Sequence, residues 1–188
     1  MKLLIIDNYD SFTYNIVQLV EELGYSDFEI RKNDEISISA INHFDKILIS
    51  PGPGIPSEAG SILQIIKKFS PSKSILGICL GHQAIAEAFG AHIFQMPRVV
   101  HGIAKRVTIV DKDEYIFKGL PLSFQAGLYH SWAVSKLPRS LKTTALADDG
   151  TIMAIAHCEF DVKGIQFHPE SIMTKFGRKI ISNWLQHL

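Results

Sequence analysis

Short apolar runs alternate with amphipathic stretches through the first ninety residues of the chain. The runs are rich in Ile and Leu and are bounded by polar or turn residues, which is typical of buried strands. We expect strands at residues 2–6, 28–31, 46–50 and 74–78. Between them, helices are predicted to begin at Ser11, near Glu58 and at Gly81. This alternation predicts a parallel sheet that is covered by helices on both faces.

The first of these helices has the clearest signals at its ends. Ser11 is a residue type that caps helices, and Gly24 is one that ends them. The apolar positions between them make one stripe at helical period. They are Phe12, Ile16, Val17, Val20 and Leu23.

The second half of the chain has a different pattern, with short strands that are separated by turns. We expect strands at residues 105–110, 131–134, 143–147, 152–157 and 162–166. Asp148-Asp149-Gly150 is typical of a hairpin turn, and a last helix is expected from Ile172 to Leu188. The predicted fold class is α/β, with an open, largely parallel, twisted sheet and mixed or antiparallel additions in the second half. No repeat or linker interrupts the chain, so we expect one domain over residues 1–188.

Composition excludes several classes of protein. The 188 residues carry 19 Lys and Arg against 19 Asp and Glu, so the net charge is zero, whereas a nucleic-acid binder needs a basic surface. No run approaches the roughly 18 apolar residues that a membrane span needs. Two cysteines cannot form the disulfide framework of a small secreted protein. We therefore expect a reduced, cytoplasmic protein that binds neither nucleic acid nor membrane.

One cysteine stands at a predicted strand-to-helix turn. Gly77-Ile78-Cys79-Leu80-Gly81 has the form of a nucleophile elbow with Cys in place of Ser. The turn would lift the thiol above the carboxyl edge of the sheet, at the N-terminus of the next helix, whose dipole favours a thiolate. The alternative is a small buried cysteine that only packs between strand and helix. Cys158 lacks flanking glycines, and we interpret it as a core or strand residue.

A thiolate nucleophile needs a proton partner, and that partner needs a group that orients it. His168-Pro169-Glu170 offers both at the end of a predicted strand, because Glu170 can hydrogen-bond the imidazole from the side opposite the thiol. The alternative is a loop histidine followed by a glutamate that favours a helix N-terminus. A cysteine elbow and a strand-end His-Pro-Glu are far less expected to occur together by chance than either is alone.

An acyl-transfer site also needs N–H donors for the oxyanion. The N–H of Leu80 is one by elbow geometry, and the second can come from Gly52 or Gly54, in a loop at the same edge of the sheet. This loop does not resemble a phosphate-binding loop, because Pro53 removes an N–H and no Gly-Lys-Ser/Thr follows.

Metal binding is not indicated either. The acidic segment that begins at Asp111 lacks the glycine of a calcium loop, with Ile116 in its place. His157-Cys158 has no second pair at ligand spacing, so it is not a zinc pattern. We expect no metal site in this chain.

The combined motifs resemble those of the class I, or triad, glutamine amidotransferases. The resemblance covers essentially the whole chain and is greatest to the glutamine subunits of anthranilate synthase (component II) and aminodeoxychorismate synthase, which the motifs do not separate. The matching segments are residues 7–15, Ser50-Pro51-Gly52-Pro53-Gly54, residues 77–83, Tyr129-His130-Ser131 and His168-Pro169-Glu170.

The resemblance implies a reaction and a set of residues. Cys79 would attack the side-chain amide of L-glutamine to give a glutamyl thioester and ammonia, with His168 as base and then acid and Glu170 orienting it. Gly52 and Leu80 would supply the oxyanion N–H groups. The implied glutamine contacts are Gly52, Pro53, Gly54, Leu80, Gln83, Ser131 and Trp132.

The resemblance also implies a partner. Ammonia would pass to a separate chorismate-binding synthase subunit that makes anthranilate, or 4-amino-4-deoxychorismate. No cofactor is expected in this chain, and magnesium is expected in the partner. We expect the loop at residues 8–13 to form part of the interface. Alternatives are a catalytically silent interaction subunit, which the intact triad disfavours, and a γ-glutamyl peptidase, which Gln83 and the Ser131 segment disfavour.

Three positions depart from the pattern of many relatives. Leu128 stands where they have Arg, Ile103 follows His101-Gly102 where they have Lys, and residues 111–117 are poorer in glycine. None of the three belongs to the triad.

Overall fold

The computed structural model describes residues 1–187. Their strands form one nine-stranded mixed sheet. Its strand order is β2-β1-β3-β4-β9-β8-β7-β5-β6. The five strands from β2 to β9 in this order are parallel, and the remaining pairs are antiparallel. The strands are β1 (Leu3–Asp7), β2 (Phe28–Lys32), β3 (Lys46–Ile49), β4 (Ser74–Ile78), β5 (His92–Ile109), β6 (Ser123–Ser135), β7 (Leu141–Ala147), β8 (Ile152–His157) and β9 (Val162–Ile165). The predicted fold class is confirmed.

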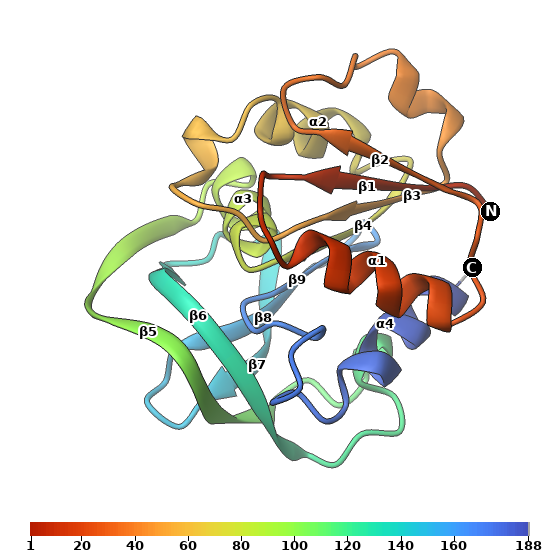
Figure 1. The fold of residues 1–188 in the computed structure, drawn as a ribbon. Helices are drawn as coiled ribbons and strands as arrows, with labels where there is room; N and C mark the ends of the chain where they lie inside the picture. Colours follow the sequence, from red (N-terminus) through yellow and green to blue (C-terminus); the bar gives the residue numbers. More distant parts are fainter. Residues whose placement is uncertain (188) are drawn as a thin grey trace.

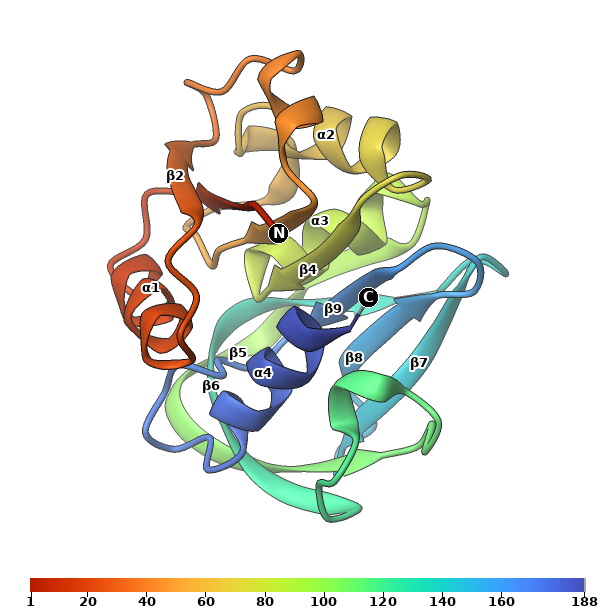
Figure 2. The ribbon, with the colours of Figure 1, turned by 90° about the vertical axis from the view of Figure 1, so that its right-hand side faces the viewer.

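Four α-helices of the described residues cover the two faces of the parallel part of the sheet. They are α1 (Thr13–Glu22), α2 (Ile62–Phe69), α3 (Leu80–Ala88) and α4 (Gly177–Gln186). Alternate residues of β1 point to opposite faces: Leu3 and Ile5 pack with α1 and α4, whereas Leu4 and Ile6 pack with α2 and α3. The two views show α1 and α3 on opposite sides of β1–β4 (Figure 1, Figure 2). No helix within residues 1–187 is long and apolar enough to cross a membrane.

The antiparallel strands are longer than predicted. β5 begins at His92 rather than near Lys105, and β6 begins at Ser123 rather than at Ser131. The first part of β5 is mostly exposed and pairs only with β6, with the register broken between Gln95 and Val100. Because few of its side chains are buried, the first part of β5 carries no alternating apolar pattern from which a strand could be predicted.

The ends of two helices also differ from the prediction. α2 begins at Ile62, because the residues near Glu58 form a separate 3-10 turn. α4 begins at Gly177, and Ile172 is fully exposed outside it. A Cβ at Gly177 would lie 1.8 Å from the Pro169 carbonyl oxygen, so the turns before the helix fold tightly onto its start. Leu188, the predicted last residue of the helix, lies outside the described residues.

The start of α1 is held by a neighbour of the predicted cap. The side chain of Asp10, rather than Ser11, accepts the N–H of Phe12 at 2.8 Å. Gly24 ends the helix as predicted: its φ is +86°, and its N–H donates to the Glu21 carbonyl.

A buried lysine fastens the last helix to the sheet. Lys46 lies at the start of β3, and its Nζ donates to the carbonyls of Trp184 at 2.8 Å and His187 at 2.7 Å. Trp184 lies in the last turn of α4 and His187 directly follows the helix, where the helix dipole favours a cation. Burial lowers the pKa of Lys46. The bonds therefore compensate for a desolvated charge.

Replacing Lys46 with Met is expected to lower the free energy of unfolding by about 1–3 kcal/mol, since it removes the charged donor that ties these two carbonyls to β3. Urea unfolding followed by circular dichroism measures this. Lys67→Met, at an exposed position of α2, is the control and should change the midpoint little. Equal midpoints for the two variants would contradict the role given to Lys46.

Candidate functional site

Cys79 lies at the turn between β4 and α3, in a backbone conformation that is rare for a residue with a side chain. Its φ is +52° and its ψ is −100°. The N–H of Cys79 donates to the Ile165 carbonyl of β9 at 2.8 Å, and its carbonyl accepts the N–H of Gln83 in the first turn of α3. The strained residue is therefore held from both sides, as the sequence motif predicted for an elbow.

The two glycines of the motif allow the strand and the helix to approach each other. A Cβ at Gly77 would lie 2.3 Å from the Gly81 carbonyl oxygen, and a Cβ at Gly81 would lie 2.5 Å from the Ile49 carbonyl oxygen. Both contacts are with backbone atoms, which cannot move aside as a flexible side chain can. Side chains at these positions would therefore separate α3 from β3 and β4.

His168 follows β9 and is tied to β6 through its backbone. Its N–H donates to the Gly127 carbonyl at 3.0 Å, and its carbonyl accepts the Thr174 hydroxyl at 2.6 Å. The rings of Phe12 and Tyr129 lie against the imidazole, with centroids 5.3 and 4.9 Å from it. The ring is 2% exposed, so its orientation is fixed by packing.

Glu170 completes the predicted pair with His168. Its Oε1 lies 2.6 Å from Nδ1 of His168, and because a carboxylate accepts, Nδ1 carries the hydrogen. Burial lowers the pKa of His168, but the Cys79 thiol and the Glu170 carboxylate outweigh that effect and raise the pKa to about 10. The structure therefore brings Cys79, His168 and Glu170 together and favours a charged imidazolium between them.

The loop after β1 supports the loop after β3. The Asn8 N–H donates to the Ser50 hydroxyl at 2.9 Å, and the Asn8 side chain donates to the Ser50 carbonyl at 2.8 Å. A Cβ at Gly52 would lie 2.6 Å from both Cβ of Asn8 and Cδ2 of Leu80. Gly52 is therefore enclosed between the first loop and the side chain of Leu80, the residue after Cys79.

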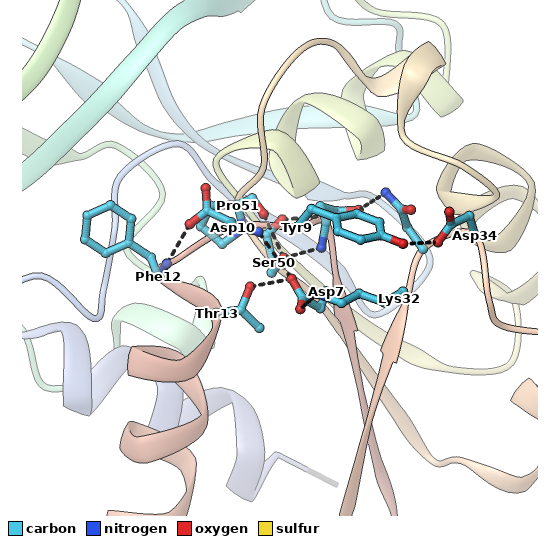
Figure 3. Close-up of polar contacts among 11 residues, drawn as sticks. Asp7, Tyr9, Asp10, Phe12, Thr13, Lys32, Asp34, Ser50 and Pro51 are labelled. Atoms are coloured by element: carbon cyan, nitrogen blue, oxygen red, sulfur yellow. Dashed lines mark hydrogen bonds and ion pairs between the residues drawn. The ribbon is translucent and has the colours of Figure 1, made fainter.

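Asp7 anchors this first loop. It forms an ion pair with Lys32 and accepts the Thr13 hydroxyl at 2.9 Å (Figure 3). Burial tends to raise the pKa of Asp7, but the hydrogen bonds from Lys32, Thr13 and the Asp10 N–H hold it below its usual value. Tyr9, with a φ of +61°, donates to Asp34 and lies under the Lys32 ammonium. The turn at Tyr9 is thus held by the Asp7–Lys32 ion pair and by the hydrogen bond from Tyr9 to Asp34.

A pocket of about 220 Å³ opens beside Cys79. Six of the seven predicted glutamine contacts line it: Gly52, Pro53, Gly54, Gln83, Ser131 and Trp132. The seventh, Leu80, has a buried side chain behind Gly52. Four further lining residues were not predicted as contacts, namely Val99, His101, Tyr129 and His130. They belong to β5 and β6, and Val99 and His101 lie in the part of β5 that the sequence pattern did not reveal.

A further residue that the sequence did not single out is Gln166. It directly follows β9, is fully buried, and donates from Nε2 to Cys79 Sγ over 3.6 Å. Its Oε1 accepts from Gln83 Nε2 at 3.1 Å. The available signal was a polar side chain between two apolar residues of a buried run, Ile165 and Phe167.

The other cysteine is not where it was predicted. Cys158 follows β8 in an exposed turn and is neither a core residue nor part of a strand. Its thiol lies 3.5 Å from the Arg139 carbonyl. β8 ends at His157, as predicted, and the stacking of His157 on Phe160 accompanies the turn in which Cys158 lies.

Comparison with known proteins gives one consistent family. The model of the glutamine amidotransferase class-I family matches residues 4–188. Anthranilate synthase component 2 of Saccharolobus solfataricus is 46% identical, over 98% of this chain and 98% of that protein. Aminodeoxychorismate/anthranilate synthase component 2 of Bacillus subtilis is 44% identical, over 98% of this chain and 95% of that protein.

A solved structure agrees with the sequence comparisons. A Thermoplasma acidophilum protein that is described as part of a GMP synthase superposes with a TM-score of 0.88 at 28% identity, over 98% of this chain and 92% of that one. The strained cysteine turn, the charged His–Glu pair and the enclosed glycine loop thus occur in a chain that matches one family over nearly its whole length. The chain belongs to the class-I glutamine amidotransferases.

Proposed function

We propose that this protein is the glutaminase subunit of a two-component synthase and supplies ammonia for the synthesis of anthranilate. The observation that carries the proposal is the pocket in which Cys79 meets Gln83 and the Ser131–Trp132 segment, beside the His168–Glu170 pair. Relatives of nearly the same length are named component 2 of anthranilate synthase. Their name supports a chorismate-binding component I as the partner.

The chemistry follows from the positions of the residues. The sulfur of Cys79 attacks the side-chain carbonyl carbon of glutamine, and the N–H groups of Gly52 and Leu80 face the oxygen that becomes negative. As the first residue of α3, Leu80 has no helical acceptor for its N–H. The intermediate collapses to a thioester as the C–N bond breaks. A water molecule then cleaves the thioester to give glutamate and restore the thiol.

His168 handles the protons in both halves of the reaction. In its charged form it already holds the proton that it gives to the departing ammonia, and the neutral ring then takes a proton from the attacking water. Glu170 keeps Nδ1 protonated, so that Nε2 is the nitrogen that exchanges protons with the substrate. Nε2 is buried and has no hydrogen-bond partner within residues 1–187.

The second candidate product is 4-amino-4-deoxychorismate. The Bacillus subtilis relative carries both aminodeoxychorismate and anthranilate synthase in its name and is 44% identical to this chain. The glutaminase chemistry is the same for either product, so the choice depends on the partner. We propose that the partner contacts the loop at residues 8–13. Tyr9 in this loop is 53% exposed, and Tyr14, which directly follows the loop, is 63% exposed.

The first test is glutamine-dependent formation of anthranilate. The protein is mixed with a chorismate-binding anthranilate synthase subunit, chorismate and magnesium, and anthranilate is followed by its fluorescence. We expect product with glutamine as well as with ammonium. Product with ammonium alone would refute the anthranilate role with that partner, and the same assay with an aminodeoxychorismate synthase subunit would then test the second product.

Replacing Cys79 with Ala is expected to abolish synthesis from glutamine and to leave synthesis from ammonium intact, because only the first needs the thiol. Cys158→Ser is the matched control and should retain synthesis from glutamine, since Cys158 is exposed and outside the pocket. Loss of both activities in Cys79→Ala would mean that the residue serves assembly. Loss of glutamine use in a folded Cys158→Ser would overturn the choice of nucleophile.

The charge of His168 gives a prediction about pH. Its pKa of about 10 lies above the value of about 6.5 for histidine in an unfolded chain. Proton binding therefore stabilises the folded state fully below pH ~6.5, and this contribution disappears as the pH rises towards about 10. NMR of the imidazole nitrogens should show His168 still charged at mildly alkaline pH.

Glu170→Gln tests the cause of that charge. Without the carboxylate, the His168 titration should move to lower pH, and the loss of stability relative to the unchanged protein should be greatest below pH ~6.5 and diminish towards about 10. An ordinary histidine titration in the unchanged protein, or one that Glu170→Gln does not move, would refute this account.

A further inference from the structure

One backbone carbonyl in the pocket accepts two side-chain hydrogen bonds. The Trp132 carbonyl lies 3.0 Å from Gln83 Nε2 and 2.8 Å from His130 Nδ1. A carbonyl oxygen can only accept, so both partners must donate to it. The amide of Gln83 is therefore oriented with its nitrogen towards β6, and the hydrogen of neutral His130 is on Nδ1.

The same logic orients the next amide. Gln83 Nε2 has a second hydrogen, which it donates to Oε1 of Gln166 at 3.1 Å. With its oxygen used in this way, Gln166 presents Nε2 to the Sγ of Cys79, 3.6 Å away. Gln83 Nε2 thus donates both to the Trp132 carbonyl and to Gln166, and Gln166 in turn donates to Cys79. We call these three bonds the amide relay.

Burial keeps the relay in this arrangement. Gln83 is 3% exposed and Gln166 is fully buried, so solvent is not available to replace a broken bond. The backbone of Gln166 is held separately, because its N–H donates to the Met153 carbonyl of β8 at 2.8 Å. The side chain is consequently not needed to pair β8 with β9, and its two polar ends bond Gln83 and Cys79 instead.

We propose that Gln166 is a positioning residue for the nucleophile, which acts by donating an N–H to the sulfur of Cys79. The inference rests on the proposed function, in which Cys79 attacks glutamine. A sulfur that accepts this N–H is held at one point of the pocket. Because hydrogen bonds to charged groups are the stronger ones, the bond favours the thiolate over the thiol.

The relay also connects the nucleophile to the substrate side of the pocket. Gln83 and Trp132 line the pocket together with Cys79, and both belong to the relay. With its nitrogen engaged by Trp132 and Gln166, Gln83 has its amide oxygen left to accept from a ligand. The orientation that gives Cys79 its donor thus also gives the pocket an acceptor of fixed position.

The decisive experiment is the pH dependence of Cys79 alkylation in the full chain. Iodoacetamide reacts with the thiolate, and mass spectrometry of the peptides reports Cys79 and Cys158 separately. In Gln166→Met, which keeps the length of the side chain but has no N–H, we expect the midpoint for Cys79 to rise by about one pH unit. Cys158, which is exposed, should show an unchanged profile and serves as the internal reference.

Two further variants separate the relay from simple packing. Gln125→Met makes the same chemical change at an exposed position of β6 and should leave the Cys79 profile unchanged. Gln83→Met removes the hydrogen bond that orients Gln166 but leaves the Gln166 N–H in place. It should therefore shift the Cys79 profile in the same direction as Gln166→Met, but by a smaller amount. This variant also tests the relay if Gln166→Met does not fold, which circular dichroism shows.

The outcomes are distinct. A folded Gln166→Met, or Gln83→Met in its place, with the wild-type Cys79 profile would overturn the proposal. The alkylation assay needs no glutamine, so a shifted profile in a protein that hydrolyses no glutamine with any partner would keep the relay and refute the proposed function. Hydrolysis of glutamine with an unmoved profile would refute the relay alone.

In the active protein, Gln166→Met should lower kcat for glutamine hydrolysis about tenfold at neutral pH and recover part of this loss at alkaline pH. A structural role alone predicts a loss that does not depend on pH.

Discussion

The left-handed backbone of Cys79 is the constraint on which the rest of the site depends. A side chain in this conformation costs about 1–3 kcal/mol and persists only where its surroundings hold it. Here the surroundings are the Ile165 carbonyl of β9 and the first turn of α3, brought close by Gly77 and Gly81. The parallel half of the sheet is thus both the scaffold and the source of the strain that raises the thiol into the pocket.

The pocket itself needs the antiparallel half. β5 and β6 contribute the wall that carries Tyr129, His130 and Trp132, and β6 also holds the backbone of His168 through Gly127. A purely parallel sheet would place Cys79 at its edge without this wall. The first part of β5 buries few side chains of its own. Its presence is therefore explained by the pocket wall that it helps to form.

The sequence predicts well what is set by local chemistry. Strands such as β4 and β8 were predicted to the residue, because continuous apolar runs between polar residues leave little choice. The start of α4 was predicted too early, because Ile172 fits the helical stripe but lies in turns that precede Gly177. Gln166 was missed for a related reason: its role arises from partners 83 and 87 positions away in the chain, which no local pattern contains.

Charge and hydrogen-bond direction together explain why so polar a site can be buried. The Cys79 thiol and the Glu170 carboxylate raise the pKa of His168, and the two amides beside Cys79 are hydrogen-bonded to each other. A buried polar group costs most when it lacks a partner. Because Gln83 Nε2 donates both to the Trp132 carbonyl and to Gln166, the two amides are stable only in one orientation. The same bonds that allow the polar site to fold therefore also determine which atoms face a ligand. In this protein the specificity of the pocket and the stability of its polar core are consequences of one arrangement.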